Sequence, residues 1–154
     1  MKLEAPPTLT FSRTTVAQLV HNPASTELFN LHFEEVGTGA RLSIDTEPFY
    51  DCEARNEFLA VAVYDGERLV GYSINTLTQH LFYDELWCNH VAIFVHPTYR
   101  RLNVCCRLMQ MVEQLATKEG CKRITMHAKP HTAMEQILIR SPYSIHETIY
   151  SMEL

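Results

Sequence analysis

Two consecutive arginines, Arg100 and Arg101, lie where an apolar stretch gives way to an amphipathic one. The stretch at 91–95 is short, apolar and partly β-branched, which is typical of a strand buried on both faces. The stretch at 104–118 has apolar residues at helical spacing, namely Val104, Leu108, Met111, Val112 and Leu115. A helix start directs free N–H groups and the positive end of its dipole at an anion. Because arginine also forks onto phosphate oxygens, this junction predicts a phosphate-binding site.

The elements that must position the junction can be predicted from residue spacing and turn residues. We expect helices from Thr14 or Thr15 to about His21, from Ser25 or Thr26 to Gly37, and at 104–118 and 132–140. We expect strands at 9–13, 58–64, 68–75, 86–96, 123–127 and 147–154, with a hairpin turn at 65–66. Residues 38–56 are expected to form a loop, with a short extended piece at 42–44.

This order, β-α-α-β-β-β-α-β-α-β, indicates a mixed α/β fold with a central twisted mixed sheet and helices on both faces. At 154 residues the chain is long enough for one sizeable core and too short for two. No domain linker interrupts it, so we expect one domain over 1–154. The last expected strand could offer its edge at 148–152 to a second copy, which would give a homodimer.

The composition excludes several classes of protein. A net charge of −5 argues against a general nucleic-acid binder, and no apolar run is long enough to predict a membrane span. The five cysteines are odd in number and two of them are adjacent, so reduced thiols in the cytoplasm are favoured over a disulfide framework.

The acidic charge is concentrated in one segment. Residues 34–57 hold seven acidic and two basic side chains, and the rest of the chain balances to zero. This segment is either a solvated acidic loop or the mouth of a site that attracts a cationic, amine-bearing partner.

Two stretches of the chain resemble a known family, the GNAT-type N-acetyltransferases. The stretch Tyr64-Asp-Gly-Glu-Arg-Leu-Val-Gly-Tyr72 is similar to its second and third strands, and Val95-His-Pro-Thr-Tyr-Arg100 to its fourth strand and cofactor loop. The resemblance covers residues 57–154 and, by element order, the whole chain. It implies acetyl-CoA as co-substrate, no metal, and an amine acceptor that is a small molecule or a lysine side chain.

The resemblance also implies a set of cofactor-binding residues. In the family, the loop amides bind the pyrophosphate and the backbone of the fourth strand pairs with the pantetheine arm. On this chain those roles fall to Ile93, Phe94, Val95, Arg100, Arg101, Leu102, Asn103, Val104, Cys105 and Cys106. The loop departs from the family pattern because Asn103 and Cys105 replace its two small residues. Asparagine tolerates the left-handed region and cysteine is small, so a working loop and a loop without its ligand both stay open.

The residues that would move protons are less regular. Many family members have a tyrosine acid on the last helix, and Leu138 occupies that position; Tyr143 could replace it or pack in the core. The family's base position on the fourth strand falls on Asn89 or, with a one-residue slip at a bulge, on His90. Glu85 could act through water. Neighbouring strand residues alternate faces, so Asn89 and His90 cannot both face the cleft without a bulge.

Three other interpretations stay open from the residues. Cys105 or Cys106 could be a nucleophile, because a helix start beside arginines lowers a thiol pKa, or they could pack beneath the loop. The histidines and cysteines lack close zinc-finger spacing, so a metal site is not expected. The altered loop and absent tyrosine also suit a non-catalytic GNAT-like structural or interaction protein, or a regulatory module that binds CoA without turnover.

Overall fold

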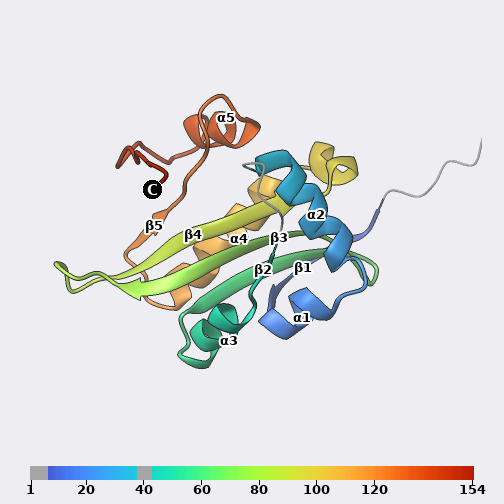
Figure 1. Ribbon diagram of the computed structural model, residues 1–154, viewed down its shortest axis with the longest axis horizontal. Helices are drawn as coiled ribbons and strands as arrows, with labels where there is room; N and C mark the ends of the chain where they lie inside the picture. The colour runs from blue at the N-terminus through green and yellow to red at the C-terminus, as the bar shows by residue number, and fades with distance from the viewer. Residues whose placement is uncertain (1–6, 38–42) are drawn as a thin grey trace, which may run out of the picture.

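A five-stranded sheet forms the centre of the protein (Figure 1). The structure is a computed structural model that describes residues 7–37 and 43–154. The strands lie in chain order: β1 (Leu9–Thr14), β2 (Phe58–Asp65), β3 (Arg68–Gln79), β4 (Leu86–Val95) and β5 (Arg123–Thr125). Neighbours from β1 to β4 are antiparallel, whereas β5 runs parallel to β4. The predicted mixed α/β class is therefore confirmed.

Helices cover both faces of the sheet, as expected (Figure 1). One face carries α1 (Val16–His21), α2 (Ser25–Val36) and α3 (Glu47–Ala54), and the other carries α4 (Val104–Lys118). The short 3-10 helix η1 (Pro97–Leu102) joins β4 to α4, and α5 (Ala133–Ile139) lies near the C-terminal segment. The α4 bounds are those predicted from residue spacing.

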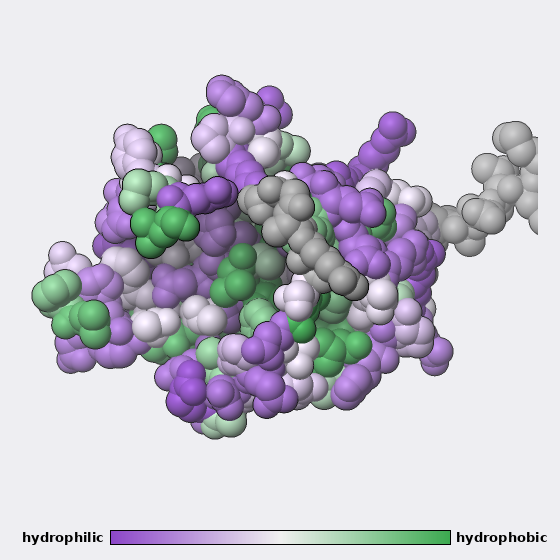
Figure 2. Space-filling view, in the orientation of Figure 1, coloured by the Kyte–Doolittle hydropathy of each residue, from purple (hydrophilic) through white to green (hydrophobic). Residues whose placement is uncertain are grey.

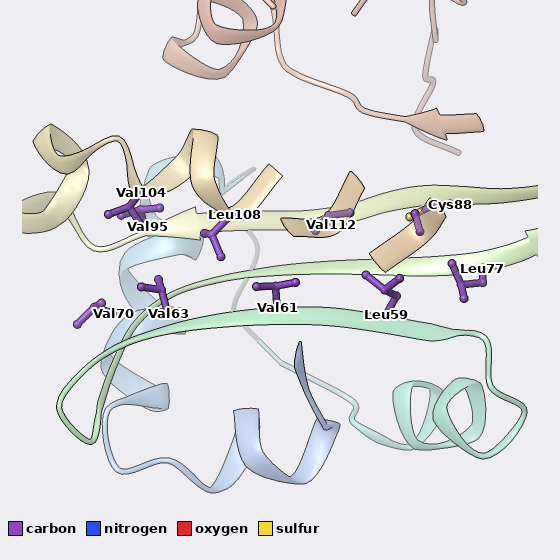
Figure 3. Close-up of a cluster of buried hydrophobic side chains, with 11 residues drawn as sticks. Leu59, Val61, Val63, Val70, Leu77, Cys88, Val95, Val104, Leu108 and Val112 are labelled. Carbon is purple, nitrogen blue, oxygen red and sulfur yellow. The ribbon is translucent and has the colours of Figure 1, made fainter. Parts of the chain in front are cut away.

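The core between α4 and the sheet fixes where α4 begins. Its buried residues are Leu59, Val61, Val63, Val70, Leu77, Cys88, Val95, Val104, Leu108, Val112 and Ala116 (Figure 3). The predicted stripe faces the sheet, with Met111 and Leu115 partly buried at its margin. Because the stripe cannot rotate without exposing these side chains, the first turn of α4 is held at the end of β4.

Two expectations for the fold are wrong. Residues 147–154 form no strand, and Ile149, Tyr150 and Met152 are exposed, so no sheet buries this apolar segment. The expected pairing of this edge with a second copy thereby loses its basis. Residues 47–54 form α3 rather than a loop, with Pro48 in its first turn, where proline suits a helix. Of the extended piece expected at 42–44, Leu42 lies outside the described residues, while 43 and 44 are irregular.

Candidate active site

The turn between η1 and α4 has the backbone conformation that glycine usually supplies. Asn103 has φ 55° and ψ 24°, in the left-handed region, where asparagine is among the tolerated residues. Its side chain caps none of the first-turn amides of α4. Those amides have no acceptor within a helix, so the turn presents N–H donors and the positive dipole end at one place. This backbone geometry at Asn103 and the first turn of α4 is compatible with an anion, as predicted for the loop.

The two arginines of the junction have different surroundings. Arg100 folds back onto β4 and α2: its Nε donates to the Val95 carbonyl at 3.0 Å and its Nη2 to Glu35 Oε2 at 2.5 Å. Its guanidinium also lies 5.2 Å from the centre of the Phe94 ring. Arg101 is exposed, and no described residue forms an ion pair or side-chain hydrogen bond with it. Arg101 is therefore the arginine available to an anion, whereas Arg100 holds the loop in place.

A stack of side chains connects α2 to this end of β4. The His32 ring stacks on Phe94 with centroids 4.7 Å apart, and its Nδ1 lies 2.6 Å from the Tyr72 hydroxyl. Burial lowers the pKa of His32, with the nearby Arg100 charge adding to this against the opposing effect of Glu35. Spacing along the sequence contains no signal for this cluster, because its members come from three separate elements.

Strands β4 and β5 separate soon after they pair. Their parallel register covers Trp87↔Arg123, Cys88↔Ile124 and Asn89↔Thr125 and goes no further, although β4 continues to Val95. The Thr125 hydroxyl donates to Asn89 Oδ1 at 2.8 Å across the last of these pairs. Beyond it, the β5-facing edge of β4, which includes Ile93, Phe94 and Val95, leads toward η1 and α4. This edge and the α4 turn together form a track along which an extended ligand with a phosphate end could lie.

A bulge lies at the point of separation. The β3–β4 register passes from Ile74↔Ala92 to Asn75↔His90, so Val91 has no partner residue on β3 and is 39% exposed. The bulge follows His90 rather than separating it from Asn89, so these two side chains still face opposite sides of the sheet. His90 shares the α4 face with Cys88, and Asn89 shares the other face with Trp87.

His90 contacts His127, a histidine that lies two residues after the end of β5. Its Nδ1 lies 3.5 Å from Nδ1 of His127, and the ring centroids are 4.5 Å apart. His90 is buried and its Nε2 contacts no hydrogen-bond partner among the described residues, whereas His127 is exposed. The pair therefore links solvent to a buried polar atom at the strand separation. Residue spacing does not predict His127 as the partner of His90, since only the parallel β4–β5 pairing brings the two side by side.

The buried His90 predicts a specific loss of stability in acid. Burial, with a contribution from the His127 charge, lowers the pKa of His90 to about 3 from the ordinary 6.5. A histidine with a depressed folded-state pKa costs stability as pH falls below its unfolded pKa, because only the unfolded chain then takes up the proton. From about pH 7.5 to about pH 5, this one group should lower the free energy of unfolding by about 2 kcal/mol.

The measurement is urea denaturation of the wild-type protein and of His90→Gln, which cannot titrate, at both pH values. The wild-type protein should lose about 2 kcal/mol more than the variant over this interval. Equal losses in the two proteins would mean that His90 is solvated rather than buried. The comparison removes the contribution of His32 and the other titrating groups, which both proteins share.

The remaining predicted site residues lie near the start of β4. Glu85 Oε2 accepts from Trp87 Nε1 at 3.1 Å, which places this carboxylate beside the indole and away from the His90–His127 pair. Asn89, with Trp87 and residues of the β3–β4 hairpin, lines an open pocket of about 290 Å³. An open groove of about 780 Å³ lies between α1, α2 and the β2–β3 hairpin and includes none of the predicted site residues.

Cys105 packs against the core between α4 and the sheet, and Tyr143 contacts α4. Burial raises the pKa of Cys105 to about 11, so its thiol is protonated at neutral pH and is a poor nucleophile. The half-buried Tyr143 donates its hydroxyl to Glu113 Oε1 on α4 at 3.0 Å. No group of three or more His, Cys, Asp or Glu side chains in the described parts of the chain is arranged to hold a metal ion.

Part of the acidic segment has structural partners. Glu35 pairs with Arg100, Glu57 with Arg55, and Glu53 accepts the Val16 N–H at the start of α1. These contacts favour the solvated, structural interpretation for the three carboxylates, whereas Asp51 and Glu47 are exposed on α3. Figure 2 shows the face that carries α1, α2 and α3, which is hollowed near its middle, with hydrophobic residues inside the hollow.

Comparisons with known proteins agree with this fold. The acetyltransferase (GNAT) family model matches residues 20–136, and no curated protein sequence matches the chain. A solved ribosomal-protein-alanine N-acetyltransferase from Brucella melitensis biovar Abortus 2308 has a TM-score of 0.78 at 11% identity, covering 96% of this chain and 98% of its own. An aminoglycoside acetyltransferase from an uncultured soil metagenomic sample, in complex with trehalose, has 0.72 at 13%, covering 94% and 97%.

A third solved structure, AAC(6′)-Iy in complex with the bisubstrate analogue CoA-S-monomethyl-acetylneamine, has a TM-score of 0.70 at 12% identity and covers 96% of this chain and 98% of its own. At such low identities, these likenesses show the fold alone. Among the described residues, no helix combines the length and the apolar composition needed to cross a membrane.

Proposed function

This chain belongs to the acetyltransferase (GNAT) family, and from that premise we propose that it is an N-acetyltransferase that uses acetyl-CoA and acetylates an amine by direct attack. The observation that carries the proposal is the track along β4. Its edge beyond Asn89 is released by β5 and ends at the left-handed Asn103 and the first turn of α4. An extended ligand with amide groups and a pyrophosphate has the shape and chemistry of that track.

Two regions would bind acetyl-CoA: the start of α4 and the edge of β4. At one end, the α4 amides from Asn103 to Cys106 and the Arg101 guanidinium would hold the pyrophosphate, while Arg100 keeps the loop against α2. Along the strand, the backbone of Ile93, Phe94 and Val95 would pair with the pantetheine amides. When bound, acetyl-CoA supplies the activated acetyl group, and these contacts fix the geometry of attack.

Proton movement is assigned to the strand separation. The attacking amine must be neutral and must lose a proton as it is acylated, and the departing thiolate must gain one. We assign this proton transfer to the His90–His127 pair. His127 is exposed to solvent, and its contact with His90 leads to the buried Nε2 atom of His90. Because the lowered pKa keeps His90 neutral, its role is hydrogen bonding within a relay rather than storage of the proton. Asn89 holds Thr125 at the opening, and a backbone N–H at the Val91 bulge would polarise the thioester carbonyl.

The acceptor would be an amine on a small molecule or a lysine side chain. Aminoglycoside acetyltransferases are among the proteins that share the fold, and their acceptors carry amines. Within the acidic segment, Asp51 and Glu47 have no structural partner in the contacts above and are exposed on α3, which covers the same face of the sheet as α2. They would raise the local concentration of a cation.

The first test is calorimetric titration with acetyl-CoA of the wild-type protein, Arg101→Ala and Arg100→Ala. Loss of a charge-assisted contact at an exposed site should weaken binding by Arg101→Ala about fivefold to tenfold. Arg100→Ala should change affinity less, because its guanidinium is already bound to Val95 and Glu35. The two single variants thereby separate phosphate contact from loop support.

The result also discriminates between enzyme and scaffold. Micromolar binding followed by acetyl transfer to members of an amine panel would support the proposed enzyme. Binding without transfer to any amine would indicate a regulatory module that binds CoA. No binding at millimolar acetyl-CoA would overturn the proposal in favour of a non-catalytic GNAT-like protein, and an effect confined to Arg100→Ala would overturn the role of Arg101.

A further inference from the structure

Two polar side chains lie opposite each other on β3 and β4, in the core between the sheet and α4. Asn75 and His90 are partners in the β3–β4 register, and Asn75 is completely buried while His90 is 8% exposed. Among the described residues, the buried side-chain atoms that have no hydrogen-bond partner are Asn75 Oδ1 and His90 Nε2. A buried polar atom is costly to leave unpaired, so two of them at one cross-strand position indicate that they serve each other.

We infer that Asn75 is a positioning residue whose carboxamide oxygen accepts a hydrogen bond from Nε2–H of His90 and so fixes the tautomer of the imidazole. This inference rests on the proposed function, because it assigns a further residue to the proton transfer at the same site. Asn75 would contact neither acetyl-CoA nor the amine, and it would act through His90 and His127.

The hydrogen bonds of Asn75 determine which end of its amide faces β4. Its Nδ2 donates to the Leu59 carbonyl and to the Ser73 hydroxyl, each at 3.2 Å. The reverse orientation would place Oδ1 against the Leu59 carbonyl, and two acceptors cannot bond to each other. Because Nδ2 is held toward β2, Oδ1 is left on the side of β4, where it can only accept a hydrogen bond.

The contact of His90 with His127 leaves its other nitrogen on the side of Asn75. Nδ1 of His90 lies 3.5 Å from Nδ1 of His127, which follows β5, so this nitrogen faces away from β3. The two nitrogens of an imidazole point in different directions, so Nε2 is directed away from His127. Cross-strand partners on one face have Cβ atoms about 5 Å apart, so rotations about the last side-chain bonds bring Oδ1 and Nε2 together.

An acceptor at Nε2 of His90 decides where the other hydrogens lie. With its hydrogen on Nε2, neutral His90 keeps a lone pair on Nδ1, and the facing Nδ1 of His127 must carry a hydrogen to donate. Burial and then the His127 charge lower the pKa of His90 to about 3, so His90 takes up no second proton at neutral pH. His127 is therefore left with its lone pair on Nε2, the atom to which we assign the proton that the amine releases.

His127 would take up and return one proton in each reaction. Its Nε2 takes the proton as the amine nitrogen bonds to the carbonyl carbon, and gives it to the thiolate that is released when the C–S bond breaks. His127 is an imidazolium only between these two events, and its Nδ1–H points at neutral His90 throughout. Asn75 thus holds the two histidines in the arrangement of hydrogens that leaves a basic nitrogen in solvent.

Nuclear magnetic resonance of the histidine rings tests this inference on the full chain. In protein labelled with nitrogen-15 at histidine, correlations between the carbon-bound ring hydrogens and both ring nitrogens distinguish the two neutral tautomers from the imidazolium. At about pH 8, His90 should carry its hydrogen on Nε2 and His127 should carry it on Nδ1. The signals are assigned by their loss in His90→Gln and in His127→Gln.

The variant Asn75→Leu replaces the carboxamide by an apolar side chain of similar size and removes the acceptor for His90 Nε2. His127 should then shift toward the Nε2–H form, which predominates for histidine in water. For acetyl transfer, kcat should fall about tenfold while KM for acetyl-CoA changes less than about twofold. The matched control is Ser73→Ala, which removes one contact of Asn75 Nδ2 and leaves the Leu59 contact, so both tautomers should stay as in the wild-type protein.

The outcomes separate this inference from the proposed function, and the wild-type spectrum decides even if Asn75→Leu does not fold. A hydrogen on Nδ1 of His90, or exchange between both forms, would overturn the inference and leave the enzyme proposal standing if amines are acetylated. The expected tautomers without acetylation of any amine would support the role of Asn75 and overturn the enzyme proposal alone. Tautomers that stay unchanged in folded Asn75→Leu would also overturn the inference, because another group would then fix them.

Discussion

Replacing Leu108 by alanine should lower the free energy of unfolding by about 3 kcal/mol, which corresponds to a fall in melting temperature of about 10 °C for a chain of this size. Leu108 is completely buried between α4 and the sheet, in the cluster that contains Val61 and Val112 (Figure 3). The cost has two parts. The first is the hydrophobic free energy that the removed methyl groups no longer contribute, and the second comes from the cavity left behind, because the surrounding helix and sheet relax into it only partly. Thermal and urea denaturation measure it.

The matched control for this prediction is Leu81→Ala, the same chemical change at a side chain that is 93% exposed. Its effect on stability should lie within about 0.5 kcal/mol of zero. A loss for Leu108→Ala no larger than for Leu81→Ala would contradict the packing of α4 described here. It would also remove the physical reason why the start of α4 is held at the end of β4.

Replacing Asn103 by valine should cost about 2 kcal/mol, because a β-branched residue strongly resists the left-handed conformation observed there. The cost can appear as lower global stability or as a loop that leaves this conformation. In the second case the first turn of α4 shifts, and acetyl-CoA affinity should fall about 30-fold. Denaturation and acetyl-CoA titration of the same preparation measure both forms of the loss.

Asn103→Gly is the control, since glycine adopts the same φ and ψ without strain. This variant should keep the stability of the wild-type protein to within about 1 kcal/mol and bind acetyl-CoA at least as tightly. If the valine variant matched the wild-type protein in both measurements, the left-handed turn would not be needed for the loop. If the glycine variant bound more weakly, the Asn103 side chain would itself contact the ligand.

Much of the fold could be predicted from residue order. The stripe from Val104 to Leu115 defined α4 to its observed bounds, since a helix that buries one face must repeat its apolar residues every three to four positions. The Asp65–Gly66 turn defined the β2–β3 hairpin, and Gly66 has φ +59° there. The final strand failed for the opposite reason: an alternating apolar pattern at 147–154 predicts a strand only if a neighbouring strand is available to pair with it. In the structure this segment pairs with no strand and its apolar side chains stay exposed, although β5 lies at the edge of the sheet. The helix α3 was missed because eight residues give little periodicity.

The candidate site divides in the same way. The sequence by itself determined the junction of strand and helix and the family resemblance, and also a residue at 103 that tolerates positive φ, because these depend on neighbours along the chain. Tertiary structure alone decided that Arg100 is bound by Glu35 while Arg101 is exposed, and that His90 is buried against His127. It also gathered His80 and Trp87 around one pocket. Each of these depends on which elements pack side by side, and contacts between residues far apart in sequence leave no local pattern from which to predict them.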